Sequence, residues 1–180
     1  MFSVKNNFIV MIRNLNKEGE IIDAITKEKV IIIKNRFARN IGSSIINMVS
    51  FSLLGGAEWD FIHQSNVIFK LKKSTFNSLV LAYNFNDNFY NVWKIRTIGT
   101  LSKFFGNIVF ESINGKLLQL KRRGLLHYSL VDSVDEIYCS VTKEIRGLVE
   151  EQYYLTVHKF LESEQNYVFL VLPVIISVYF

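Results

Sequence analysis

Hydrophobic and polar residues alternate along most of the chain between residues 20 and 160. In one stretch, Val67, Phe69 and Leu71 fall on one side of an extended chain, and Lys70 and Lys72 fall on the other. A period of two residues with one apolar side is typical of half-buried antiparallel strands. The pattern predicts a meander of hairpins followed by one further strand, over residues 20–36, 58–74, 79–97, 107–124, 127–144 and 148–160.

Short polar segments separate the alternating stretches and predict the hairpin turns. Asn114-Gly115 is the strongest of these signals, because both residues tolerate the positive φ angles of a type I′ turn. Residues 63–66 and 86–88 are weaker candidates, built mainly from Asn, Asp, Gln and Ser. We therefore expect the chain to reverse direction at these three places.

Two stretches depart from the alternation, and the first is residues 40–56. This stretch carries no charge and ends in a glycine pair. A short helix, an apolar loop over one end of a barrel, or a surface that touches lipid would each account for it. We favour packing over a barrel mouth, because exposed apolar patches are uncommon on soluble proteins.

The second exception is the chain's most hydrophobic segment, residues 167–180. Its 14 residues would be about 21 Å long as a helix, whereas a bilayer has a hydrocarbon core of about 30 Å. No Lys or Arg follows it to hold the far end among headgroups, so a membrane tail anchor is disfavoured. Ten or more antiparallel strands, in contrast, can close into a barrel that needs filling. We expect this segment to form a helix through the lumen of such a barrel.

Three residues define the expected helix more closely. Ser163 is a candidate N-cap, and Glu164 would lie favourably in the first turn. Pro173 falls in the middle, where it removes one backbone hydrogen bond and clashes with the preceding turn. We therefore expect a kink between Phe169 and Pro173, or a helix that starts late.

Length and composition predict one domain over residues 1–180, since 49% hydrophobic residues suffice for a sizeable core. The N-terminus lacks the features of a secretory signal, and no segment reaches the roughly 18 apolar residues of a spanning helix. The chain is therefore expected to be intracellular and cytoplasmic. Its formal net charge of +5 would attract acidic partners such as phospholipid headgroups or nucleic acid; the alternative is an ordinary soluble surface.

The order and texture of these elements resemble the tubby C-terminal-like superfamily, which includes the LURP-one-related and phospholipid scramblase-like proteins. The resemblance covers residues 8–180 and lies in hairpins with basic strand ends, followed by LESEQ and a terminal hydrophobic helix. EWDFIHQSNVIFKLKK, FESINGKLLQLKRR and YSLVDSVDEIYCSVTKE show the repeated unit. The resemblance implies a closed antiparallel β-barrel of about twelve strands around a central C-terminal helix, and binding of lipid headgroups.

The chain also departs from that superfamily in its functional residues. The acidic calcium-binding pattern of scramblases is not recognisable in LESEQNY, which has only Glu162 and Glu164. The phosphoinositide-binding basic residues of tubby domains do not align with particular lysines here. Lipid recognition is therefore implied for the superfamily and not for named residues.

Candidates for catalysis or metal binding are sparse. His63, His127 and His158 are isolated, and no HExxH or CxxC spacing is present, so we expect no bound metal and no cofactor. Cys139 alternates with apolar neighbours, which favours a buried structural thiol over a nucleophile. No motif pairs a nucleophile with a base, and we expect a protein that is not an enzyme.

An acidic cluster, Asp132, Asp135 and Glu136, lies where a hairpin turn is expected. Catalytic carboxylate pairs would need a cleft around them. We therefore interpret the cluster as solvated turn residues.

The basic ends of the strands are the one recurrent candidate for binding. If the hairpins are neighbours, these residues converge on one rim or outer face and attract phosphate, at about 1 kcal/mol per residue near an anionic membrane. The alternative is that they keep strand edges from aggregating. The candidate anion-binding residues are Lys70, Lys72, Lys73, Lys94, Arg96, Lys121, Arg122 and Arg123, with Lys34 and Arg36 in a similar position.

Three function classes follow. The first is a non-catalytic module that recognises anionic phospholipid headgroups at the cytoplasmic membrane face, as a peripheral protein. The second is a structural or protein-interaction domain without a small ligand, which uses a strand edge or residues 40–56. The third and less favoured is nucleic-acid binding through an exposed aromatic such as Tyr90 near Lys94.

Overall fold

The computed structural model of the protein describes residues 7–13, 18–36, 58–75, 78–85, 88–98, 107–147 and 150–179. Twelve strands are followed by a short 3-10 helix, η3 (Ser163–Asn166), and one α-helix, α3 (Tyr167–Tyr179). The strands are β1 (Asn7–Arg13), β2 (Gly19–Asp23), β3 (Lys29–Asn35), β4 (Glu58–His63), β5 (Asn66–Thr75), β6 (Ser78–Phe85), β7 (Asn88–Ile98), β8 (Asn107–Ser112), β9 (Leu117–Arg122), β10 (His127–Val131), β11 (Ile137–Arg146) and β12 (Glu150–Val157).

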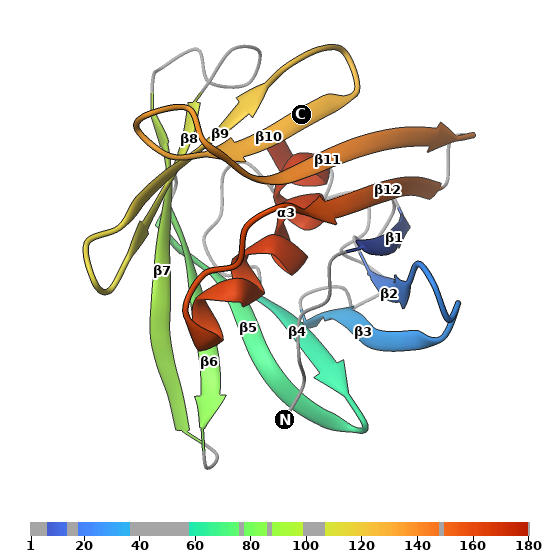
Figure 1. The fold of residues 1–180 in the computed structure, drawn as a ribbon. Coiled ribbons are helices and arrows are strands. Elements are labelled where there is room, and N and C mark those ends of the chain that lie inside the picture. The colour runs from blue at the N-terminus through green and yellow to red at the C-terminus, as the bar shows by residue number, and fades with distance from the viewer. Residues whose placement is uncertain are drawn as a thin grey trace.

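The twelve strands form one closed antiparallel barrel. Each strand from β2 to β12 pairs with its neighbours in sequence, and β1 pairs with both β2 and β12 and so closes the ring. In Figure 1 the strands encircle α3. The predicted closed barrel of about twelve strands around a C-terminal helix is confirmed. The strand β1 lies outside the repeating units that the alternation predicted.

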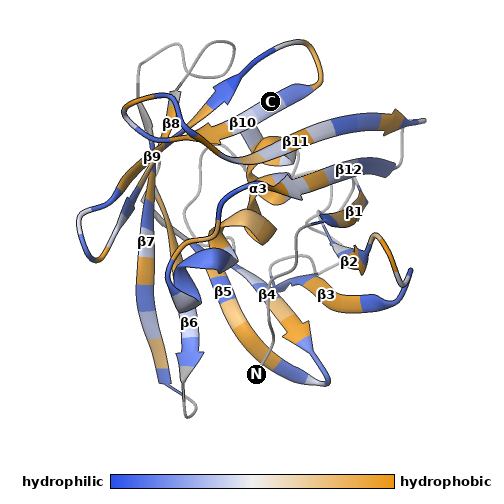
Figure 2. Cartoon of the chain, in the orientation of Figure 1, coloured by the Kyte–Doolittle hydropathy of each residue, from blue (hydrophilic) through white to orange (hydrophobic). Residues whose placement is uncertain are grey.

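The barrel core consists of the inward side chains of the strands packed around α3. Phe69 and Leu71 on β5 are fully buried, and Trp93 and Ile95 on β7 are each 1% exposed. Every helix residue from 167 to 176 is buried. Figure 2 shows this division, with α3 mostly hydrophobic and the strands changing between hydrophobic and hydrophilic along their length. The terminal hydrophobic run therefore fills the barrel, as its composition predicted.

The start of the helical segment differs from the expectation. Ser163 is not an N-cap: it is the first residue of η3 and has a positive φ of 34°. The side chain of Asn166 instead stabilises the segment that leads into the helix. It accepts a hydrogen bond from the Leu161 N–H and donates to the carbonyl oxygens of Leu161 and Ser163. A short polar side chain that bonds its own loop competes with capping, which explains the error.

Pro173 neither ends nor delays the helix. The α-helix begins at Tyr167 and is continuous to Tyr179, with Pro173 inside it. Proline has no N–H to donate to the Phe169 carbonyl, and burial in the lumen holds the helix together in spite of this loss. The late start is therefore wrong, and a kink between Phe169 and Pro173 stays a prediction.

The type I′ turn lies in a different hairpin from the one that the sequence predicted. Gln64 and Ser65, between β4 and β5, both have positive φ angles (47° and 69°), as a two-residue type I′ turn requires. At the predicted Asn114-Gly115 turn only Gly115 has a positive φ, 77°, and the Ser112 N–H reaches across to the Lys116 carbonyl oxygen. The hairpin is confirmed there, but its type I′ assignment is wrong. At 86–88, β6 ends at Phe85 and β7 begins at Asn88, while residues 86 and 87 lie outside the described residues.

Two further expectations concern contact with lipid. None of the described helices is both long enough and apolar enough to cross a membrane. The uncharged stretch 40–56 belongs to the connection between β3 and β4 and lies outside the described residues.

Candidate functional site

The alternating strand directions bring the basic strand ends to one end of the barrel. Because neighbouring strands are antiparallel, β3, β5, β7 and β9 all run in the same direction. Their C-terminal ends carry the candidate basic residues, and they lie at one end of the barrel, which we call the basic end. The described hairpin turns β2–β3, β4–β5 and β8–β9 lie at the other ends of these strands, which we call the hairpin end. The expected convergence on one end of the molecule follows from this topology.

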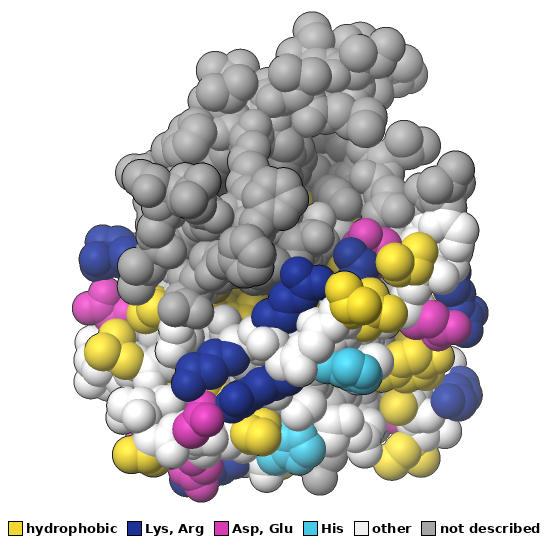
Figure 3. All heavy atoms as spheres, turned by 90° about the horizontal axis from the view of Figure 1, so that it is seen from above, with side chains coloured by type: hydrophobic (Ala, Val, Ile, Leu, Met, Phe, Trp, Pro, Cys, Tyr) yellow, Lys and Arg dark blue, Asp and Glu magenta, His cyan; other side chains and the backbone are white. Residues whose placement is uncertain are grey.

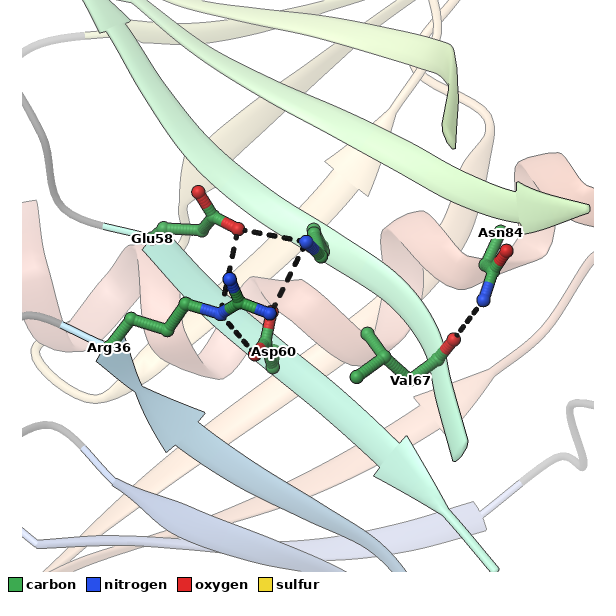
Figure 4. A network of polar contacts seen from close by, with 6 residues as sticks. Arg36, Glu58, Asp60, Val67 and Asn84 are labelled. Carbon is green, nitrogen blue, oxygen red and sulfur yellow. Dashed lines mark hydrogen bonds and ion pairs between the residues drawn. The ribbon is translucent and has the colours of Figure 1, made fainter. Parts of the chain in front are cut away.

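Lys70 forms ion pairs with other residues of the protein on the outer face of β4 and β5. Its Nζ lies 3.1 Å from the Glu58 carboxylate and 3.9 Å from the Asp60 carboxylate, and 4.1 Å from the centroid of the Phe89 ring. Asp60 also accepts a 2.5 Å hydrogen bond from Arg36 Nε, and Arg36 and Glu58 lie together in Figure 4. The hydrogen bond that Arg36 donates to Asp60 raises the pKa of Arg36 further above its usual value. Lys70 and Arg36 are therefore already neutralised by the protein.

Arg96 on β7 and the basic residues at the end of β9 also contact other groups of the protein. Arg96 lies 3.0 Å from the Glu111 carboxylate. Lys121 and Arg123 share the Asp135 carboxylate at 2.9 and 2.8 Å, and the hydrogen bonds from these two side chains lower the pKa of Asp135. The remaining candidate on this strand binds backbone: Arg122 donates to the carbonyl oxygens of Gly124 and Leu125.

Lys72 and Lys94, like Lys34 on β3, differ from these candidates. Each is exposed and forms no ion pair with any side chain in the described part of the chain. Lys72 and Lys94 occupy one row across three strands, because Val80 on β6 is the register partner of both. Two strand spacings of about 4.8 Å place their Cα atoms about 10 Å apart on the outer face. Lys73 is the next residue of β5, and its side chain lies outside the described residues.

Mixed charge is also visible on the face of the barrel in Figure 3. Lys and Arg side chains lie beside Asp and Glu side chains at several places there, among hydrophobic ones. Among the described residues on this face, basic side chains do not form a continuous patch. On this face, therefore, charges of both signs are interspersed.

A partly buried ion pair lies on the inner side of the barrel and was not predicted. Lys143 on β11 and Glu151 on β12 are 2.9 Å apart, with side chains 10% and 13% exposed. Tyr153 donates a 2.5 Å hydrogen bond to Glu151. Burial by itself would raise the pKa of Glu151, but the hydrogen bonds from Tyr153, Lys143 and Ser177, together with the Lys143 charge, lower it below its usual value. The sequence signal was the inward phase that Lys143 shares with Cys139 and Val141.

The other chemical candidates occupy structural positions. Cys139 is fully buried, and burial raises the pKa of its thiol well above the usual value, so the interpretation as a structural thiol agrees with its position. Asp132 lies in the β10–β11 turn, where its carboxylate accepts hydrogen bonds from the backbone N–H groups of Val134 and Glu136. No group of three or more potential metal ligands occurs among the described residues.

One nucleophile–base contact emerges that no sequence motif indicated. Ser140 Oγ lies 2.9 Å from His158 Nε2, with Ser140 on β11 and His158 just after β12. The contact is exposed, and hydrolytic sites of this type also hold the imidazole with a third group and stabilise an oxyanion. Neither is found for His158 among the described residues. The pair therefore carries no catalytic assignment.

No protein-family model, curated protein or solved structure matches this chain. The resemblance to the tubby C-terminal-like superfamily therefore stays a prediction, while the barrel and central helix that it implied are present.

Proposed function

We propose that the protein is a non-catalytic binding module that recognises anionic phospholipid headgroups at the cytoplasmic face of a membrane, to which it binds peripherally. The observation that carries the proposal is the row across β5–β7. Lys72 and Lys94 flank Val80 on one outer face, and neither is neutralised by a described carboxylate. Their in-register acidic neighbours are already occupied, Glu58 by Lys70 and Glu111 by Arg96.

The geometry of this row suits a phosphate group. Lysine presents a compact charge on a long flexible stem, so two lysines about 10 Å apart can approach one headgroup from both sides. The apolar Val80 side chain between them offers no competing hydrogen bond. Each lysine near an anionic surface contributes about 1 kcal/mol, so the two together would strengthen binding by roughly thirtyfold.

Co-sedimentation with vesicles tests the proposal. The wild-type protein should sediment more strongly with phosphatidylcholine vesicles that contain phosphatidylserine or a phosphoinositide than with phosphatidylcholine alone. The double variant Lys72→Ala/Lys94→Ala should lose binding by roughly ten- to thirtyfold, and added salt should weaken the wild type.

The matched control removes the same charge from the hairpin end. Lys27 lies in the β2–β3 turn and Lys159 follows β12, so Lys27→Ala/Lys159→Ala should bind nearly as well as wild type. Equal binding to neutral vesicles, no binding to either kind, or an equal loss in the control variant would refute the proposal. Self-association that is indifferent to lipid would instead support the protein-interaction alternative.

A further inference from the structure

The hairpin end of the barrel contains a cavity of about 370 Å³ beside the start of the helical segment. Tyr83 and Tyr90 from β6 and β7 line it, together with Ile113 from the β8–β9 turn and with Glu162 and Glu164. This volume lies within the range of small-ligand pockets. We propose that this cavity binds a trimethylammonium group, held by the two tyrosine rings and the two carboxylates.

The tyrosine rings provide faces for a cation. Tyr83 and Tyr90 are direct register partners on antiparallel strands, so their side chains lie next to each other on the same side of the sheet. Tyr83 is held in place by stacking on Tyr167, with centroids 5.4 Å apart, and Tyr167 stacks on Phe69 at 4.8 Å. Tyr90 is 55% exposed, so its ring is open to a ligand. Aromatic rings in such positions attract cations through their electron-rich faces.

The two carboxylates that line the cavity are not neutralised by a basic side chain among the described residues. Glu162 and Glu164 form no ion pair with any side chain in the described part of the chain. In that same part, the carboxylates that do pair with Lys or Arg belong to Glu20, Glu58, Asp60, Glu111, Asp135, Glu136, Glu144 and Glu151. The cavity therefore has uncompensated negative charge in a protein of formal net charge +5.

A third tyrosine ring lies next to Tyr83. Burial, with smaller contributions from Tyr83 and Glu164, raises the pKa of Tyr167 to about 12. Tyr167 is neutral at physiological pH, as an ordinary tyrosine would be, and adds a further uncharged aromatic surface next to Tyr83. The electrostatics at this position favour a cation, in contrast to the basic end.

The lining selects among cations. Calcium and magnesium prefer six or more oxygen ligands in close geometry. Here the two carboxylates share the lining with two tyrosine rings, Val92 and Ile113, and with the uncharged polar residues Asn91, Asn114, Ser163 and Gln165. A bare ammonium group is strongly hydrated and loses much on leaving water. A trimethylammonium group is bulky and weakly hydrated, and it matches tyrosine faces, the apolar Ile113 and a nearby carboxylate together.

Titration calorimetry with choline and with a peptide that carries trimethyllysine tests the inference and separates a free ligand from a modified protein as the source. At least one probe should bind with a millimolar or lower dissociation constant. The neutral carbon analogue of choline, dimethylbutanol, and the unmethylated lysine peptide should bind about tenfold more weakly than their methylated counterparts.

Variants assign the binding to the cavity. Tyr90→Ala and Glu164→Gln should each weaken the probe that binds by about five- to tenfold. The control Tyr154→Ala removes an exposed tyrosine of β12 outside the cavity and should leave binding unchanged. Both cavity variants change partly exposed side chains, and a thermal melt confirms folding.

Three outcomes would overturn the inference. They are that neither probe binds, that dimethylbutanol binds with the same affinity as choline, or that Tyr154→Ala loses as much affinity as the cavity variants. The Lys72→Ala/Lys94→Ala variant should bind choline like wild type, because its changes lie toward the basic end, so the two proposals fail or succeed independently.

Discussion

At the scale of single residues, polar groups inside the barrel are tolerated only where they satisfy one another. Lys143 and Glu151 face inward near the end of α3, where a lone charge would be costly. Tyr153 and Ser177 complete the hydrogen bonding of the Glu151 carboxylate. The pair therefore also links β11 and β12 to the helix that they surround.

This arrangement predicts a specific dependence of stability on pH. The pKa of Glu151 is lower in the folded protein than its reference value of 4.5, so the stabilisation from its charge is complete above about pH 4.5 and is lost as the pH falls through the folded pKa. At neutral pH, the free energy of unfolding of the variant Glu151→Gln should be about 1–3 kcal/mol lower than that of wild type. It should also lose less stability than wild type on acidification from about pH 6 to about pH 3. Urea unfolding at a series of pH values measures both effects.

The control for this experiment is Glu136→Gln, which breaks an exposed pair with Lys159. Its free energy of unfolding at neutral pH should stay close to that of wild type, since exposed pairs contribute little. If Glu151→Gln retained the full acid dependence of wild type, the assigned role of the partly buried pair would be wrong.

At the scale of elements, the strand pairs are set by close backbone contacts as well as by hydrophobic phase. Gly19 begins β2 and pairs with Ile12 on β1. A Cβ atom at Gly19 would lie 1.9 Å from the Met11 carbonyl oxygen, which is backbone and cannot rotate away. Glycine is therefore required here for β1 to approach β2 and then reach β12.

Replacement of this glycine should loosen the closure of the barrel. Gly19→Ala should destabilise the protein by about 1–3 kcal/mol or more, because the β1–β2 contact must open. Gly124→Ala is the matched control: its Cβ would meet only the His127 side chain, at 3.5 Å, and the change should be nearly neutral. Thermal unfolding compares the two, and equal midpoints would show that the close contact does not matter.

At the scale of the whole molecule, the barrel and the helix depend on each other. The lumen of the twelve-stranded ring is lined by large apolar side chains such as Trp59, Phe61 and Phe110, and α3 buries all of its residues from 167 to 176 among them. Among the described residues, the inward side chains of the strands and those of α3 form one hydrophobic core. The barrel should therefore fold only with its helix.

A chain that stops after Asn166 should be insoluble or should unfold without cooperativity. Leu172→Ala is the milder companion change, which keeps the helix and should cost about 2–5 kcal/mol while the protein stays soluble. Size-exclusion chromatography and thermal melts report on both. A truncated protein that is monomeric and melts cooperatively would contradict the interdependence of barrel and helix.

Much of the fold was predictable because it depends on local spacing. The alternation around Lys70 and Lys94 assigned the inward and outward sides of β5 and β7, and the uniform hydrophobicity of residues 167–180 predicted a buried helix. Ser163 does not cap the helix, because the Asn166 side chain forms hydrogen bonds with the backbone of Leu161 at this position. Such competition between nearby side chains is not encoded in the identity of one residue.

The candidate sites were less predictable, because they depend on pairs of residues far apart in the chain. The basic residues of the strand ends were visible in the sequence, but their ion pairs were not: Lys121 meets Asp135, and Arg36 meets Asp60. The cavity at the hairpin end combines Tyr83 and Tyr90 with Glu164, which follows the last strand. No periodic pattern connects these residues.

The sequence by itself determined which side of each strand is apolar and that the terminal segment must be surrounded, because both follow from side-chain spacing along one element. The tertiary structure alone decided that β1 closes the ring against β12, that Lys72 and Lys94 remain without partners among the described residues, and that two tyrosines share a cavity with two free carboxylates. The physical reason is the distance along the chain over which each effect acts. Periodicity reflects the local backbone, whereas barrel closure and charge pairing depend on contacts between residues far apart in the sequence. No single strand specifies the register of those contacts.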